Sequence, residues 1–415
     1  MKKRVVITGC GIISSLGNSY QDVIKSLREG KSGIRKVVEW EKFGLKSSVA
    51  GIIRHTEEKE KKANIPRRKR LCMSGASFYC VLAAHDALQN ACLADNEIKN
   101  DDCGCFVGSG ISDVFAIHDG ANKLYDMKAR RINPHSVAHA MSSSCSANVV
   151  NMFPVGGRSY SIGAACATSA HNIGHAFELI QNGILNTAIA GGGEDVNPIL
   201  TAAFCAMRIA LSTKYNDTPE KASRPYDVDR DGFVISGGAG IVILEELEHA
   251  KNRGATIYAE IVGFHANSDG YDIFLPDPKG TMTARCMKKA MGNADISPDS
   301  VDYINTHGTS TIVGDLAEIN AIKKVFEKNI PYLSSTKSLG GHSLGAAGVH
   351  ELIYCLGMME NDFIAASNNI ESLDQEFVGI PIAQEVLSKE LNIIISNNFG
   401  FGGTNATIVL RRNHD

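Results

Sequence analysis

Short runs of apolar residues alternate along this chain with longer stretches in which apolar positions recur at helical spacing. The runs are bounded by glycine and polar residues, as buried strands are. In the helical stretch after residue 166, Ile173, Ala176, Phe177 and Ile180 fall on one face. The alternation predicts an α/β fold. The strands that we expect in the first half lie at residues 5–7, 105–108, 160–162, 187–192 and 240–245.

The second half of the chain repeats the order of the first. Residues 259–263 correspond to 5–9, 301–305 to the strand at 105, 332–336 to the strand before residue 166, and 392–396 to 187–193, while 406–410 close the set. We therefore expect an α/β unit used twice, with halves at 1–253 and 254–415. If the halves pack about a pseudo-twofold axis, equivalent turns face each other. The charged linker at 213–235 is then expected at the mouth of their junction.

Cys166 lies where the strand at 160–162 passes through Gly163, Ala164 and Ala165 into a helix. Unpaired backbone N–H groups and the helix dipole favour a thiolate at such a position. The small neighbours leave room for a substrate. The alternative is a small buried cysteine in a tight turn.

Composition restricts the classes of protein to consider. The chain has 415 residues, 44% of them hydrophobic, and a formal net charge of -3, which gives no general case for binding nucleic acid or a membrane. Its eleven cysteines are scattered, and none completes a zinc motif, so a reducing cytoplasm is the expected setting. The basic, apolar start resembles a signal peptide, but its glycines favour a buried first strand.

Two local patterns leave alternatives open. Gly9, Gly11 and Gly17 suggest a dinucleotide-binding turn, yet Ser14 stands where that fingerprint needs its third glycine, which argues against it. Two groups of basic residues form either solvated faces or a docking patch for an acidic partner. These groups are Arg67, Arg68, Lys69 and Arg70, and Lys123, Lys128, Arg130 and Arg131.

His307 and His342 each stand beside glycines, His307 after the predicted strand at 301–305 and His342 near the turn that corresponds to the cysteine. A single histidine is more often structural, but two opposite a cysteine point to a shared site. One sulfur and two imidazoles suit acyl transfer, in which the sulfur holds an acyl group and imidazole N–H groups stabilise an enolate oxygen.

At these residues the chain resembles the β-ketoacyl-acyl-carrier-protein synthases of the elongating class, most closely the synthase I type, nearly from end to end. The matching blocks are residues 165–170, 305–311, 335–337 with 341–348, and 396–405, joined by 211–224 and 345–354. The resemblance implies a thiolase-like fold of duplicated halves in an αβαβα five-layer sandwich. It also implies a homodimer, an acidic acyl carrier protein as partner and substrates carried on phosphopantetheine. No cofactor is required.

The resemblance also assigns roles to residues. Cys166 accepts the acyl chain, and the N–H groups of Cys166 and Phe401 form the oxyanion hole. His307 and His342 promote malonyl decarboxylation, while Lys337, near Glu318, tunes their charge and favours the thiolate. Further assignments are a gate at Phe401, pantetheine contacts at Thr309 and Thr311, a pocket lining at Phe233 and Phe399, and a buried monovalent cation or water site at Asn305, Glu351, Ser396 and Asn397.

Some positions depart from the family pattern without removing a catalytic group: Gly340, Ile312 and Ser144. Ile111 resembles synthase II at a position where synthase I carries glycine, so synthase II stays open as an alternative subtype, and we expect the side chain to restrict long acyl chains. Three alternatives stay open: a ketosynthase of a polyene or polyketide pathway, a thiolase-like CoA enzyme, and a non-catalytic chain-length subunit. His342 argues against a thiolase, and Cys166 against the non-catalytic subunit.

Overall fold

The computed structural model describes residues 2–207 and 210–414. Ten strands form one mixed sheet in the order β10-β9-β13-β14-β8-β1-β7-β6-β4-β5. The first half of the chain supplies β1 (Val5–Ser14), β4 (Cys103–Gly108), β5 (Ser159–Tyr160), β6 (Thr187–Glu194) and β7 (Gly238–Glu246). The second half supplies β8 (Ala259–Ser268), β9 (Tyr303–Asn305), β10 (Tyr332–Ser334), β13 (Ile393–Gly400) and β14 (Thr404–Arg411).

The sheet order confirms the predicted strand correspondence. Reading outward from the central pair β1 and β8, each half runs through two antiparallel pairings and then two parallel ones. The halves are joined where Val5 pairs with Ile261 and Ile7 with Ala259. The fifth strand is shorter than predicted, because only Ser159 and Tyr160 pair at the exposed edge of the sheet.

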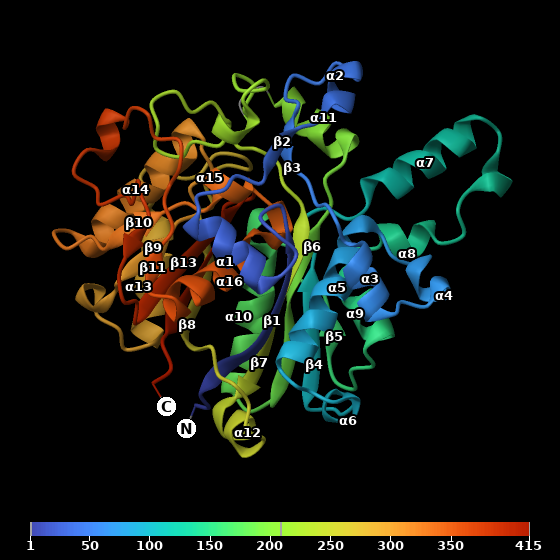
Figure 1. Cartoon of the computed structure of the whole chain (residues 1–415), viewed down its shortest axis with the longest axis horizontal. Coiled ribbons are helices and arrows are strands. Elements are labelled where there is room, and N and C mark those ends of the chain that lie inside the picture. Colours follow the sequence, from blue (N-terminus) through green and yellow to red (C-terminus); the bar gives the residue numbers. More distant parts are fainter. Residues whose placement is uncertain (1, 208–209, 415) are drawn as a thin grey trace.

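Helices cover the sheet in layers (Figure 1). The helices α10 (Thr168–Gln181) and α16 (Ala347–Glu360) lie at the centre and pack against strands of both halves in one hydrophobic core. Outside them, α5 (Gly75–Asn90) and α9 (Ser144–Met152) cover the first half of the sheet, and α13 (Thr281–Asn293) and α14 (Ile312–Phe326) cover the second. The two halves of the sheet, joined through β1 and β8, thus form the two β layers of the predicted five-layer αβαβα arrangement.

Sequence explains why α16 occupies the central layer. Nearly every residue from Ala347 to Met359 is apolar or small, and all of them are buried. A helix that is apolar on all sides has no face for water and must lie inside the protein. The glycines of β1 have a related role: a Cβ on Gly9 or Gly11 would lie 2.5 or 2.1 Å from a carbonyl oxygen of α5. They therefore allow strand and helix to pack closely and do not form a dinucleotide site.

Shorter elements surround this frame. The two small sheets pair β2 (Ile34–Lys36) with β3 (Val49–Gly51) and β11 (Phe363–Ile364) with β12 (Leu387–Ser388). The remaining α-helices are α1 (Tyr20–Arg28), α2 (Val38–Lys42), α3 (Glu57–Ala63), α4 (Arg67–Arg70), α6 (Asp95–Ile98), α7 (Val114–Tyr125), α8 (Ser136–Ala140), α11 (Pro198–Ala206), α12 (Leu247–Asn252) and α15 (Lys337–Gly340). Within the described ranges, no helix is long and apolar enough to span a bilayer.

Candidate active site

A cavity of about 150 Å³ lies where the ends of the strands of the two halves meet. It brings together residues more than a hundred positions apart in the chain, including the sulfur of Cys166 and both predicted imidazoles. The residues predicted from the sequence that line it are Cys166, Phe233, His307, Thr309, Thr311, Glu318, His342, Phe399 and Phe401. Phe204 and Phe274, which the sequence reading missed, line it as well.

The backbone at Cys166 forms a tight elbow. A 3₁₀ turn, η2 (Ala165–Ala167), leads directly into α10, and Ala165 has φ +46°, in the left-handed region that a residue with a side chain rarely adopts. Side chains hold this conformation: Ala164 N–H donates to Thr168 Oγ1 over 2.8 Å, and Asn172 binds both the N–H and the carbonyl of Ile162. The elbow aims the thiol at the cavity.

Burial, however, dominates the ionisation of this thiol. It raises the pKa of Cys166 to about 12, although Lys337 and the N–H groups of Phe401 and Cys166 act to lower it. These N–H groups and Lys337 favour the thiolate, as predicted, but loss of hydration on burial outweighs them and keeps the thiol protonated. The same two N–H groups lie where they can stabilise negative charge beside the sulfur.

The two imidazoles are held face to edge. Their ring centroids are 5.2 Å apart with an interplanar angle of 88°. The turn of His307 is fixed by Glu318, whose carboxylate accepts N–H groups from His307 at 3.0 Å and Gly308 at 2.9 Å. Burial and the charge of Lys337 hold the pKa of both histidines well below the usual value, so both rings are neutral.

Lys337 lies near enough to Glu318 to act on its charge, as predicted, but its direct partner is another carboxylate. Its Nζ forms a buried ion pair with Glu351 of α16, with the two side chains 3% and 2% exposed. Glu318 instead binds the backbone of the His307 turn and Asn397. Burial raises the pKa of Glu318 to about 7, and the charge of Lys337 acts to lower it without a direct contact between the two side chains.

The residues expected at a cation or water site are divided between two faces of β13. Ser396 and Asn398 project toward α16, where Asn398 Nδ2 donates to Glu351 over 2.6 Å. Asn397 projects the other way, donates to Glu318 and accepts from Thr407. Alternate residues of a strand face opposite sides, so Asn398, not Asn397, joins Glu351.

Two oxygens support a small ligand at this place. Ser396 Oγ and Asn398 Oδ1 are buried without a hydrogen-bond partner, while the Asn305 side chain acts on Glu351 and lowers the pKa of its carboxyl group. Oxygen atoms of this kind suit a monovalent cation or a water. Among the residues that the structure describes, no group of three or more His, Cys, Asp or Glu side chains could hold a metal ion.

Aromatic rings enclose the cavity. Phe401 packs edge to face on Phe274 with ring centroids 5.4 Å apart, and Phe233 packs on His342 in the same manner with centroids 5.3 Å apart. Two threonines add hydroxyl groups, since Thr309 and Thr311 lie 3.0 Å apart at Oγ1. The cavity therefore offers apolar walls with a few polar groups, as ligand sites commonly do.

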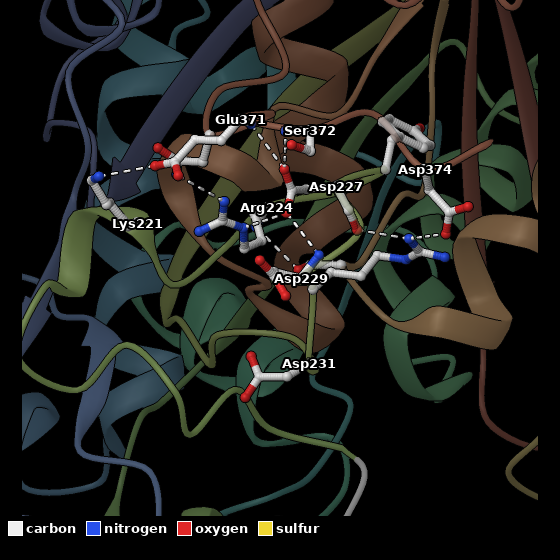
Figure 2. Close-up of polar contacts among 12 residues, drawn as sticks. Lys221, Arg224, Asp227, Asp229, Asp231, Glu371, Ser372 and Asp374 are labelled. Carbon is white, nitrogen blue, oxygen red and sulfur yellow. Dashed lines mark hydrogen bonds and ion pairs between the residues drawn. The ribbon is translucent and has the colours of Figure 1, made fainter. Parts of the chain in front are cut away.

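A buried ionic network holds the loop that carries Phe233 (Figure 2). Asp227 Oδ1 accepts from Arg224 Nε at 2.9 Å, and its Oδ2 accepts the N–H groups of Glu371 and Ser372. Arg230 binds Asp374 at 2.8 Å. The linker was predicted at the mouth of the junction. Of its charged residues, Arg224, Asp227 and Arg230 are buried, whereas Lys214, Asp217, Glu220, Lys221 and Asp229 are exposed.

This loop binds Lys337, His342 and the residue before His307 in the second half. Tyr226 Oη lies 2.6 Å from Thr306 Oγ1, next to His307. Ser223 Oγ donates to the carbonyl of Lys337 over 2.7 Å, and His342 N–H donates to the carbonyl of Val234 over 2.7 Å. The loop of the first half thus fixes the geometry of the second.

Other predicted residues lie outside the cavity. Ile111 is 38% exposed and is not among the described residues that line it. The basic residues lie on the side of the molecule where α4, α7 and α8 project (Figure 1). Lys123 and Lys128 pair with Asp119 and Asp126, and Arg70 stacks on Phe78 at 4.0 Å. The exposed members of the set are Arg67, Arg68, Lys128, Arg130 and Arg131.

Comparison with known proteins agrees with the fold. The family model for the beta-ketoacyl synthase N-terminal domain matches residues 2–250, and that for the C-terminal domain matches residues 258–371. The chain is 48% identical over 414 residues to 3-oxoacyl-[acyl-carrier-protein] synthase 1 of Haemophilus influenzae, with 99% of each covered. It is 48% identical over 415 residues to the protein of the same name from Escherichia coli K12, with 100% of each covered.

A solved structure is similar throughout. The beta-ketoacyl synthase of Burkholderia phymatum STM815 superposes with a TM-score of 0.93 at 34% identity, covering 99% of this chain and 100% of that one. The fold, the matched models and the full-length identity lead to one conclusion: the chain belongs to the β-ketoacyl synthase family.

Proposed function

We propose that this protein is a β-ketoacyl-acyl-carrier-protein synthase of the synthase I type. It condenses an acyl group held on Cys166 with malonyl-acyl carrier protein and so elongates fatty acids by two carbons. One observation carries the proposal: a single apolar cavity holds one thiol and two neutral imidazoles. The full-length identity to curated synthases 1 supports the subtype.

The first half-reaction loads the enzyme. The Cys166 sulfur attacks the thioester carbonyl of the acyl carrier protein, and the N–H groups of Cys166 and Phe401 hold the oxyanion of the tetrahedral intermediate. Since the thiol is protonated, its proton leaves as the carbon–sulfur bond forms and passes to the departing carrier sulfur. The carrier thiolate leaves, takes up that proton and departs as the thiol.

The second half-reaction makes the carbon–carbon bond. Both imidazoles are uncharged, so each can donate an N–H to the carbonyl oxygen of the malonyl thioester. Carbon dioxide leaves, the enolate oxygen gains these two hydrogen bonds, and the α-carbon attacks the acyl-Cys166 thioester. The Cys166 thiolate leaves and takes up one proton from solvent, which neutralises the negative charge left by the lost carboxylate. Lys337 keeps the imidazoles neutral because a fixed cation disfavours imidazolium.

The surroundings of the cavity support the expected substrates and partners. Thr309 and Thr311 present hydroxyl groups for a phosphopantetheine arm, and no other cofactor is needed for this chemistry. The exposed arginines Arg67, Arg68, Arg130 and Arg131 suit an acidic carrier protein. Exposed apolar residues of α7, among them Phe115, Ile117 and Leu124, suit a homodimer interface. All eleven cysteines are free, which suits the cytoplasm.

The decisive experiment uses purified protein. Incubation with malonyl-acyl carrier protein and a series of saturated and unsaturated acyl-acyl carrier proteins should give β-ketoacyl products two carbons longer, identified by mass spectrometry. The Cys166→Ala variant should form no product from acyl donors. Wild-type protein that leaves all these substrates unchanged would contradict the proposal. Exclusive use of CoA thioesters would favour a thiolase-like enzyme, and repeated extension of one chain would favour a polyene or polyketide ketosynthase.

A further inference from the structure

Glu194 is a buried carboxylate that the condensation mechanism does not use. It ends β6 directly behind the cysteine elbow and is 1% exposed. Its Oε1 accepts the hydroxyl of Ser109 at 2.7 Å, and its Oε2 accepts the N–H groups of Gly110 at 2.8 Å and Gly345 at 3.1 Å. All three partners are donors, so the site is complementary to the carboxylate form.

Three backbone segments meet at this carboxylate. A Cβ on Gly345 would lie 2.2 Å from the nitrogen of Gly110, and a Cβ on Gly110 would lie 3.0 Å from the carbonyl oxygen of Ala165. Only glycine allows the loop after β4 and the turn after His342 to approach so closely. The contact places the Glu194 carboxylate against the backbone that carries Cys166.

Gly345 is the counterpart of Cys166 in the duplicated fold. Each is the middle residue of a 3₁₀ turn before a central helix, η2 for Cys166 and η5 (Leu344–Ala346) for Gly345. The residues before them, Ala165 and Leu344, both have φ +46°. In the first half, the backbone N–H of Cys166 faces its own sulfur. In the second half, the equivalent N–H of Gly345 donates to the Glu194 carboxylate.

We propose that Glu194 is a positioning residue for the cysteine elbow: its carboxylate joins the two loops behind Cys166 and keeps a negative charge there that disfavours the thiolate before substrate binds. The proposal rests on Cys166 being the nucleophile of the proposed function. It adds a residue that restrains the resting thiol, which limits reaction with electrophiles other than the acyl donor.

The electrostatics agree with this geometry. The charge of Glu194 raises the pKa of the Cys166 thiol, while Lys337 lowers it. Burial raises the pKa of Glu194 itself to about 7, against the hydrogen bonds from Ser109, Gly345, Gly110 and Ile111, so the carboxylate is charged above neutral pH. The other titratable groups that face this pair are the imidazoles of His307 and His342 across the cavity and the Cys80 thiol of α5.

The test measures alkylation of the thiol without any substrate. Wild type, Glu194→Gln, Glu194→Asp and Asp195→Asn are treated with iodoacetamide between pH 7 and 10, and the adduct at each cysteine is quantified by peptide mass spectrometry. Removing a charge near a titrating group shifts its pKa by about one unit, so Glu194→Gln should alkylate Cys166 about tenfold faster at pH 8.5. Glu194→Asp keeps the charge and should stay within about twofold of wild type.

Controls separate this effect from simple loosening. Asp195, the next residue, faces the start of α5, where its oxygen would meet a Cβ on Gly75 at 2.2 Å, so Asp195→Asn should leave the Cys166 rate unchanged. Cys72 and Cys205 are half-buried thiols that report general opening in the same sample. Equal acceleration at Cys72, Cys205 and Cys166, or no acceleration at Cys166, would overturn the proposal. Because the assay contains no thioester, its failure is distinct from failure of the proposed condensation.

A second measurement addresses positioning. In the condensation assay, Glu194→Gln should lower kcat at least fivefold with KM for malonyl-acyl carrier protein within twofold, because the elbow shifts while the carrier-docking surface does not. Ser109→Ala removes one hydrogen-bond donor but keeps the Glu194 charge. It should therefore also lower kcat, but it should not give the roughly tenfold faster alkylation of Cys166 expected for Glu194→Gln. Unchanged kcat in both variants would contradict the positioning role.

Discussion

Replacing Lys337 with methionine tests the electrostatic core of the active site. Methionine keeps the length and volume of the side chain but removes the cation, leaving the Glu351 carboxylate 2% exposed with Asn398 as its hydrogen-bond donor. Breaking a buried ion pair by removing one partner costs about 3–5 kcal/mol. Replacing both partners with apolar residues is often neutral. Lys337→Met should therefore be strongly destabilised, and Lys337→Met/Glu351→Leu should recover most of the loss.

The destabilisation should also depend on pH in a definite direction. Burial raises the pKa of Glu351 above its value in the unfolded chain, and Lys337 opposes this rise. Without the lysine, the folded state holds the Glu351 proton more tightly than the unfolded state does. Stability of Lys337→Met relative to wild type should then fall as pH rises above about 4.5. The loss should be larger at pH 8 than at pH 5.5.

Denaturant titration provides the measurement. The chain has one tryptophan, Trp40, which is 5% exposed and packs in the same apolar cluster as Phe233 and Cys166, so its fluorescence reports unfolding around the cavity. Far-UV circular dichroism checks that the transition is global. A loss below about 1 kcal/mol for Lys337→Met, or a double variant less stable than the single one, would refute the reasoning.

Three further predictions concern other parts of the molecule. Because the pKa values of His307 and His342 lie below 6.5, the folded state excludes protons that the unfolded state binds. Stability should therefore fall as pH drops below about 6.5, by up to about 1.4 kcal/mol per pH unit for each histidine. The denaturant midpoint of the double variant His307→Asn/His342→Asn should fall less steeply with pH than that of wild type, and an equal slope would count against neutral imidazoles. Ile111→Gly tests the sequence-based expectation that this side chain restricts long acyl chains, although it lies outside the described cavity. The variant should accept longer chains, measured by product mass in the elongation assay, and an unchanged length preference would remove this idea. Arg230→Met leaves Asp374 without its 2.8 Å partner and Asp315 buried without a nearby cation, so it should cost about 3–5 kcal/mol in denaturant titration; a loss confined to about 0.5 kcal/mol would show that the network of Figure 2 is not structural.

The strands and the duplicated order could be predicted because they depend on local patterns. Apolar runs between glycines mark the buried strands, and the repeated order of strands brings Cys166, His307 and His342 to one cavity. Small residues at 163–165 likewise indicated the elbow, although not the left-handed Ala165.

Pairings between distant side chains could not be predicted in the same way. The partner of Lys337 depends on how α16 packs beside α15, and the choice of Asn398 over Asn397 depends on the phase of one strand. The pKa of Cys166 depends on how completely the cavity excludes water, which no local pattern records. Glu194 gave no signal of its own, because its partners come from loops 85 and 151 residues away.

The loop from residue 222 to 236 makes the structure of the second half depend on the first. Its residues come from one half, yet they bind beside His307, Lys337 and His342 of the other. The second half produced alone would thus lack the loop that supports its candidate catalytic residues. Chimeras that exchange halves between related enzymes should work only when this segment travels with the half it supports.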